Sequence, residues 1–181
     1  MDSIDNQSWA NLSSPPAERA LRHQAYDKYI TDEVVPFIRK HCQDDKIKTI
    51  TSGVSLGGYH AANFFFRHPD LFSMMVAISG LYQLNHFIGD YIDDNVYYNT
   101  PLAYLPKLDD PWYLDLYRKG KIVACSGQGA YEEAMLKDTL ELKRILEEKN
   151  IPAWIDIWGY DVNHDWPWWR KMLPYFLEQL V

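Results

Sequence analysis

The chain has 181 residues, of which 47% are hydrophobic and 24% charged. A length of this order predicts one domain, residues 1–181, and the composition excludes a disordered, collagenous or coiled-coil protein. Asp and Glu number 25 against 18 Lys and Arg, which gives a formal charge of −7. Because binding to nucleic acid needs a basic surface, this balance argues against a nucleic-acid partner.

The cysteines and the apolar runs indicate the compartment. Cys42 and Cys125 stand apart, with no CxxC motif and no histidine cluster, so we expect reduced thiols, no metal site and no cofactor. No apolar run approaches the roughly 20 residues of a membrane span, and the first five residues lack the basic and apolar regions of a secretory signal. The sequence therefore predicts a cytoplasmic protein without a membrane partner.

The predicted elements alternate between helices and strands. A helix is expected to begin near Pro15 and Pro16, with a kink at Pro36. After it, strands are expected at 47–51, 73–78, 121–125 and 153–158, and helices at 58–67, 132–149 and 166–180. A long irregular segment rich in tyrosine, about 85–111, separates the second and third strands. This alternation predicts an α/β fold with a mainly parallel sheet flanked by helices.

The segment Gly53–Gly58 carries the first chemical signal. It reads Gly-Val-Ser-Leu-Gly-Gly, a G-x-S-x-G pattern where a predicted strand ends and a helix begins. In that context the serine stands exposed on a tight turn, and the free N–H groups of the new helix suit a developing oxyanion. Ser55 is therefore the predicted nucleophile, although a glycine-rich turn of this kind also serves helix packing alone.

A serine hydroxyl needs a base within hydrogen-bonding distance. His164 lies between the last predicted strand and the last helix, in the chain order serine, acid, histidine that α/β-hydrolases follow. It is the predicted base, and a packed histidine in an aromatic core is the alternative.

The acid that orients this histidine is expected on the loop after the third strand. That loop contains no Asp, so a Glu must serve, and Glu132 is the first choice because it precedes the helix. Glu133 pairs more naturally with Lys137, and Asp161 remains a further candidate. Acidic residues in a first helical turn also suit the helix dipole, so the acid stays open.

Beyond these residues, the chain resembles the esterases of the α/β-hydrolase superfamily, of the esterase D and antigen 85 type. The resemblance rests on the elbow, on Arg67-His68-Pro69-Asp70-Leu71-Phe72, on the Tyr98–Pro106 region and most specifically on His164-Asp165-Trp166-Pro167-Trp168-Trp169. It implies Ser55 as nucleophile, His164 as base and the Leu56 amide as one oxyanion donor.

The chain departs from the family pattern in two places. Many such esterases have Asp about three residues after the loop glycine, where this chain has Ala130. The family's sheet also begins with several strands before the elbow strand, and one early loop supplies a second oxyanion N–H. Here about 45 residues precede the elbow strand, so the chain resembles a family member shortened at its N-terminus, with weakened activity.

Two classes of function follow from these observations. The first is a serine carboxylester hydrolase acting on a small-molecule ester, or an acyltransferase that uses the same acyl-enzyme. The second is a non-catalytic hydrolase-like binding module. Missing early strands would leave a sheet edge without a partner, which predicts a homo-oligomer.

Overall fold

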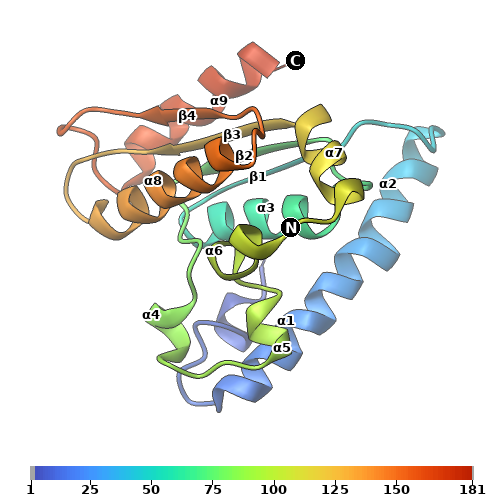
Figure 1. Cartoon of the computed structure of the whole chain (residues 1–181), viewed down its shortest axis with the longest axis horizontal. Coiled ribbons are helices and arrows are strands. Elements are labelled where there is room, and N and C mark those ends of the chain that lie inside the picture. The colour runs from blue at the N-terminus through green and yellow to red at the C-terminus, as the bar shows by residue number, and fades with distance from the viewer. Residues whose placement is uncertain (1–2, 181) are drawn as a thin grey trace.

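A four-stranded parallel sheet forms the centre of the computed structural model, which describes residues 3–180 (Figure 1). The strands are β1 Ile50–Val54, β2 Met74–Ile78, β3 Lys121–Ser126 and β4 Trp154–Ile157, in the spatial order β1-β2-β3-β4. Neighbouring strands run parallel throughout. The predicted α/β class and parallel sheet are confirmed.

The first strand lies three residues beyond its predicted range of 47–51. Ile50 pairs with Met74, and the register then continues through Gly53 opposite Ala77 to Val54 opposite Ile78. Ser52 and Gly53 have weak intrinsic strand preference, so local composition places the strand too early. Pairing with the buried apolar strand β2 overrides that preference.

The two faces of the sheet bury different side chains. On one face, Met75 and Ala124 belong to a core that includes Phe65 of α3 (Leu56–Arg67) and Leu142 of α8 (Glu133–Glu148). On the other face, Val123 and its neighbours pack with α9 (Trp166–Leu180). Figure 1 shows α3 and α8 on the near side of the sheet and α9 behind it. Helices therefore cover both faces of the sheet, which gives three layers.

The N-terminal helix is not continuous. It consists of α1 (Pro16–Tyr29), a π-helical turn (Ile30–Val34) and α2 (Val35–Cys42), and Figure 1 shows these segments as a long blue rod beside α3. Pro36 has no N–H and cannot bond to the carbonyl four residues earlier. The preceding turn adopts π spacing instead, with the Val35 N–H donating to Ile30 O. The predicted irregularity at Pro36 therefore takes the form of a π-turn.

Short helices occupy much of the segment that was expected to be irregular. They are α4 (Asn85–Ile88), α5 (Asp94–Tyr97), α6 (Pro101–Tyr104) and a 3₁₀ turn (Leu105–Lys107), followed by α7 (Pro111–Lys119). A further 3₁₀ turn spans Asp5–Gln7. Side-chain caps stabilise two of these helix starts, since Asp93 accepts from the Val96 N–H and Asp110 from the Trp112 N–H. Capping and proline placement explain helices too short for periodicity to reveal.

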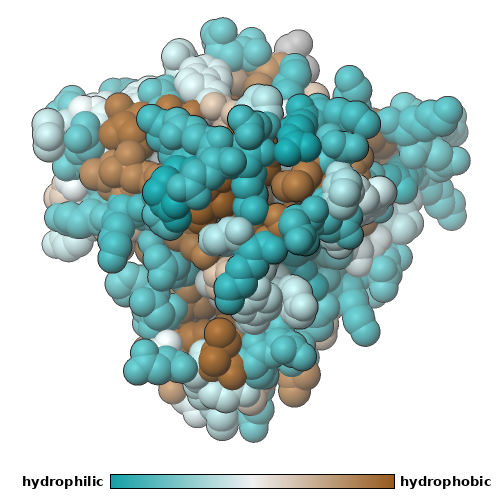
Figure 2. All heavy atoms as spheres, viewed as in Figure 1, coloured by the Kyte–Doolittle hydropathy of each residue, from teal (hydrophilic) through white to brown (hydrophobic). Residues whose placement is uncertain are grey.

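Hydrophobic side chains reach the surface as separate patches between larger hydrophilic areas on the face seen in Figure 2. Within residues 3–180, each helix is too short or too polar to cross a bilayer.

Candidate active site

Ser55 occupies the single residue between β1 and α3. Its φ of 55° and ψ of −124° lie in a region that residues with side chains seldom adopt, so the turn is strained. Gly53 makes the turn possible, because a Cβ there would stand 2.2 Å from the carbonyl oxygen of Gly57. The strand, turn and helix around Ser55 match the expected elbow.

His164 lies on the loop between β4 and α9. Its Nε2 is 2.8 Å from Ser55 Oγ, although 109 positions separate the two residues along the chain. The Trp169 ring stands edge-on to the imidazole, with ring centroids 4.8 Å apart. This geometry allows the serine hydroxyl to donate to Nε2 while a partner binds Nδ1.

Glu132 supplies that partner. Its carboxylate Oε1 is 3.2 Å from His164 Nδ1, and the residue has 0% of its surface exposed. The hydroxyl of Ser126 donates to Oε2 at 2.8 Å, and that of Ser79 donates to Oε1 at 2.6 Å. Both oxygens of the buried carboxylate are therefore satisfied, and one of them faces the histidine.

The loops that carry Glu132 and His164 are joined by backbone contacts. The Gly129 N–H donates to Val162 O at 2.9 Å, and the His164 N–H donates to Ala130 O at 3.0 Å. A Cβ at Gly129 would lie 2.3 Å from the side-chain oxygen of Asn163, so glycine permits this close approach. These contacts between the two loops keep the carboxylate next to the imidazole.

The structure distinguishes among the three acids that the sequence left open. Glu133 and Asp161 are exposed, and Glu132 is the carboxylate that contacts His164. Glu132 precedes α8 but makes no capping hydrogen bond there, so a capping role does not explain its burial. The expected Glu133–Lys137 ion pair is absent from the described residues, where α8 pairs Arg144 with Glu148 instead.

Three residues that contribute to the site had no predicted role there: Ser79, Ser126 and Trp169. Ser79 has a φ of 49°, and its hydroxyl accepts from Trp169 Nε1 at 3.3 Å while donating to Glu132. Ser79 and Ser126 each stand at the carboxyl end of a central strand, directly before a glycine. That shared position was the available signal, because sites in such sheets form at the carboxyl ends of strands.

The Leu56 N–H, the predicted oxyanion donor, opens α3 immediately after Ser55. The first N–H groups of a helix have no intrahelical acceptor, so this donor is available beside the serine. Within residues 3–180, no three His, Cys, Asp or Glu side chains gather as metal ligands. Cys42 and Cys125 are unpaired, and burial raises the pKa of the Cys125 thiol.

The tyrosine-rich segment between the second and third strands lies away from Ser55. Tyr97, Tyr98 and Tyr104 line a cavity of about 460 Å³ together with Arg67, the last residue of α3. Twelve residues of helix rise about 18 Å, so this cavity lies near the opposite end of α3 from Ser55. Tertiary packing carries these tyrosines away from the elbow.

A family model described as "Putative esterase" matches residues 2–180. The chain belongs to this esterase family. No curated protein matches it by sequence.

Solved structures with the same fold include several serine hydrolases. A ferulic acid esterase is 22% identical with a TM-score of 0.68, and the match covers 84% of this chain and 59% of that one. S-formylglutathione hydrolase from Staphylococcus aureus is 18% identical with a TM-score of 0.55, over 86% of this chain and 61% of that one. Dipeptidyl peptidase 4 from Porphyromonas gingivalis is 16% identical with a TM-score of 0.64, and the match covers 85% of this chain and 22% of that one. This chain thus spans about three fifths of the length of the first of these structures.

Proposed function

We propose that this esterase is a serine carboxylester hydrolase that acts through an acyl-enzyme on Ser55. The observation that carries the proposal is the 2.8 Å contact between Ser55 Oγ and His164 Nε2. The buried carboxylate of Glu132 at His164 Nδ1 supports it, because a carboxylate there fixes the tautomer that leaves Nε2 free to accept a proton.

In the proposed reaction, Ser55 Oγ attacks the ester carbonyl carbon while its proton passes to His164 Nε2. The carbonyl oxygen becomes an oxyanion, which accepts a hydrogen bond from the Leu56 N–H. Collapse of this intermediate breaks the bond to the alcohol, which leaves with the proton from His164. Water then attacks the acyl-serine with His164 as base, releases the acid and restores Ser55.

Glu132 has a supporting part in this proposal. Its charge stabilises the imidazolium that forms when His164 takes the proton, in a site where burial strengthens electrostatic interactions. Ser79 and Ser126 hold the carboxylate in place through their hydroxyls. The carboxylate therefore needs no movement during the reaction.

Labelling with a fluorophosphonate probe tests the proposal, because only an activated serine reacts readily. We expect wild type to label and to hydrolyse p-nitrophenyl acetate, and Ser55→Ala to do neither while remaining folded by circular dichroism. Ser52→Ala is the matched control, since Ser52 is an exposed serine on the same strand, and it should behave as wild type.

Other outcomes assign the alternatives. A folded wild-type protein that neither labels nor hydrolyses would indicate a non-catalytic binding module. Hydrolysis that gives way to ester exchange when an acceptor alcohol is added would indicate an acyltransferase.

A further inference from the structure

The cavity lined by Tyr97, Tyr98 and Tyr104 lies at the end of α3 remote from Ser55. Its volume of about 460 Å³ falls in the range of small-molecule sites. Six aromatic side chains line it: Phe66, Tyr97, Tyr98, Tyr104, Tyr113 and Tyr117. Aromatic walls of this kind offer flat apolar faces on which another ring stacks. None of these six side chains takes part in the reaction proposed at Ser55.

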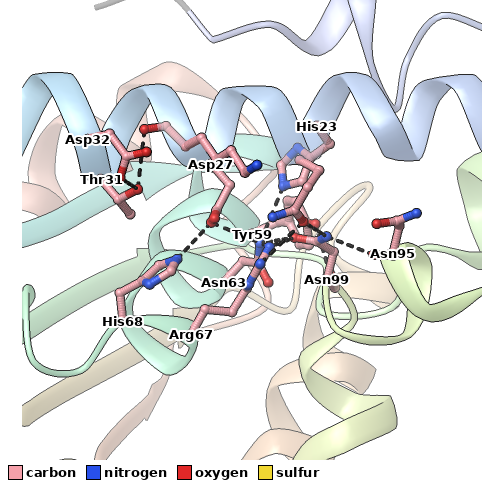
Figure 3. A network of polar contacts seen from close by, with 12 residues as sticks. His23, Asp27, Thr31, Asp32, Tyr59, Asn63, Arg67, His68, Asn95 and Asn99 are labelled. Carbon is pink, nitrogen blue, oxygen red and sulfur yellow. Dashed lines mark hydrogen bonds and ion pairs between the residues drawn. The ribbon is translucent and has the colours of Figure 1, made fainter.

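Arg67, which lines the cavity, is held in position by several polar contacts. Arg67 contacts the buried carboxylate of Asp27 at 3.4 Å and donates to the side-chain oxygens of Asn99 and Gln24. His68, also a lining residue, is 2.9 Å from the same Asp27 oxygen. Figure 3 shows Arg67, the last residue of α3, and His68, which follows it, pointing toward Asp27 on α1, with Asn99 alongside. Because Asp27 already balances Arg67, this guanidinium is not free to bind a ligand's charge.

The hydroxyl of Tyr104 lies out of reach of a molecule in the cavity. The residue is 7% exposed, and its hydroxyl oxygen is buried without a hydrogen-bond partner among residues 3–180. Because the surrounding atoms leave that oxygen no accessible surface, Tyr104 offers a molecule in the cavity its ring and not its hydroxyl.

Two further charges remain at the rim. Lys107 and Asp109 are exposed lining residues of opposite sign, and Lys107 Nζ stands 5.6 Å from the centroid of the Tyr97 ring. A ligand that complements both carries a carboxylate for Lys107 and an ammonium for Asp109. The aromatic lining requires a ring on the same molecule.

We propose that this cavity binds a zwitterionic aromatic amino acid. The ring lies among the tyrosines, the carboxylate accepts from Lys107, and the ammonium donates to Asp109. The site is separate from Ser55 and does not depend on the proposed hydrolysis.

Calorimetric titration with three related probes tests the assignment. L-phenylalanine carries both charges, 3-phenylpropanoate lacks the ammonium, and phenethylamine lacks the carboxylate. We expect L-phenylalanine to bind more tightly than either analogue, at a single site. Absence of saturable binding of L-phenylalanine at concentrations up to roughly 10 mM would overturn the proposal.

Variants then locate the binding. Lys107→Gln should weaken L-phenylalanine and 3-phenylpropanoate by about three- to fivefold without affecting phenethylamine, because exposed charge pairs are worth little more than this. Asp109→Asn should weaken L-phenylalanine and phenethylamine and leave 3-phenylpropanoate unchanged. Lys171→Gln is the matched control, since Lys171 also stands over an aromatic ring, that of Trp168, but lies outside the cavity. Equal affinity in all three variants would contradict the assigned contacts.

Tyr104→Phe tests whether this residue contributes its ring alone. Removing an unpaired buried hydroxyl should leave the thermal unfolding temperature unchanged or higher, and the affinity for L-phenylalanine should stay unchanged because the ring remains. A fall in affinity at an unchanged unfolding temperature would contradict the contacts assigned to the ligand. His164→Ala should leave binding intact. If His164→Ala abolishes binding and Lys107→Gln does not, the ligand occupies the site at Ser55 and the second site is overturned.

Discussion

Replacing Glu132 with glutamine probes the arrangement around His164 most sharply. The change keeps the shape of a side chain that is fully buried, so the fold should survive. Three hydrogen bonds from Ser79, Ser126 and His164 converge on the carboxylate, and a glutamine amide offers one oxygen where the carboxylate offers two. At least one of the three donors then faces an NH₂ group, and the histidine tautomer with Nε2 free is no longer favoured.

The expected loss is large. In the serine-protease template an acid-to-amide change at this role lowers kcat about 10⁴-fold. That factor corresponds to about 5.4 kcal/mol of lost transition-state stabilisation. We therefore expect kcat for p-nitrophenyl acetate to fall by about 10³- to 10⁴-fold in Glu132→Gln.

Two control variants replace Glu133 and Asp161, the exposed acids that the sequence also offered as partners for His164. Glu133→Gln and Asp161→Asn should each retain activity within a few-fold of wild type, with circular dichroism and thermal unfolding measured for all three variants. A folded Glu132→Gln protein with more than a tenth of wild-type kcat would refute the reasoning. A severe loss in either control would move the role to that residue.

Further predictions concern the support of the site, acid stability and assembly. Ser79→Ala should lower kcat about tenfold and more than Ser126→Ala, because Ser79 binds the same Glu132 oxygen that faces His164; equal kcat values would contradict this. Burial, with the charges of His60 and Arg67, lowers the pKa of His23 well below its usual value, so His23 is neutral in the fold. The unfolded chain then binds one more proton below about pH 6.5, and the free energy of unfolding should fall by up to about 1.36 kcal/mol per pH unit there. Urea titrations from pH 7 to pH 5 should show a flatter slope for His23→Gln, whereas an unchanged slope, or an equal change in the exposed control His41→Gln, would contradict this origin. Among the described residues β1 pairs with β2 alone, so we expect dimers at micromolar concentration, and light scattering that shows a monomer would count against it.

The parts of the fold that sequence reasoning predicted are those with a strong local signal. Met74–Ile78 reads as a buried strand because its apolar run is continuous, and α8 carries a clear apolar stripe. The elbow at Ser55 and the loop at His164 were found because glycines and chain order mark them. The glycines lie close to Ser55 in the sequence, and the order serine, acid, histidine is the one that α/β-hydrolases follow.

The parts of the fold and of the site that the sequence did not predict depend on contacts between segments far apart in the chain. Ser55 and His164 are 109 positions apart, so no local sequence pattern indicates the 2.8 Å contact between their side chains. Ser79 and Ser126 reach Glu132 only because β2 and β3 are neighbours in the sheet. The cavity around Tyr104 likewise forms from the end of α3 and the α5–α7 segment, so aromatic content alone could not place it.

Trapping the acyl-enzyme tests the central claim most directly. Wild-type protein mixed with p-nitrophenyl acetate, quenched in acid within the first turnovers and digested should yield the Ser55 peptide carrying one acetyl group. The account predicts this adduct in wild type and Ser52→Ala, and its absence in Ser55→Ala. Hydrolysis without an acetylated Ser55 peptide, or an acetyl group that persists elsewhere in Ser55→Ala with activity intact, would contradict it.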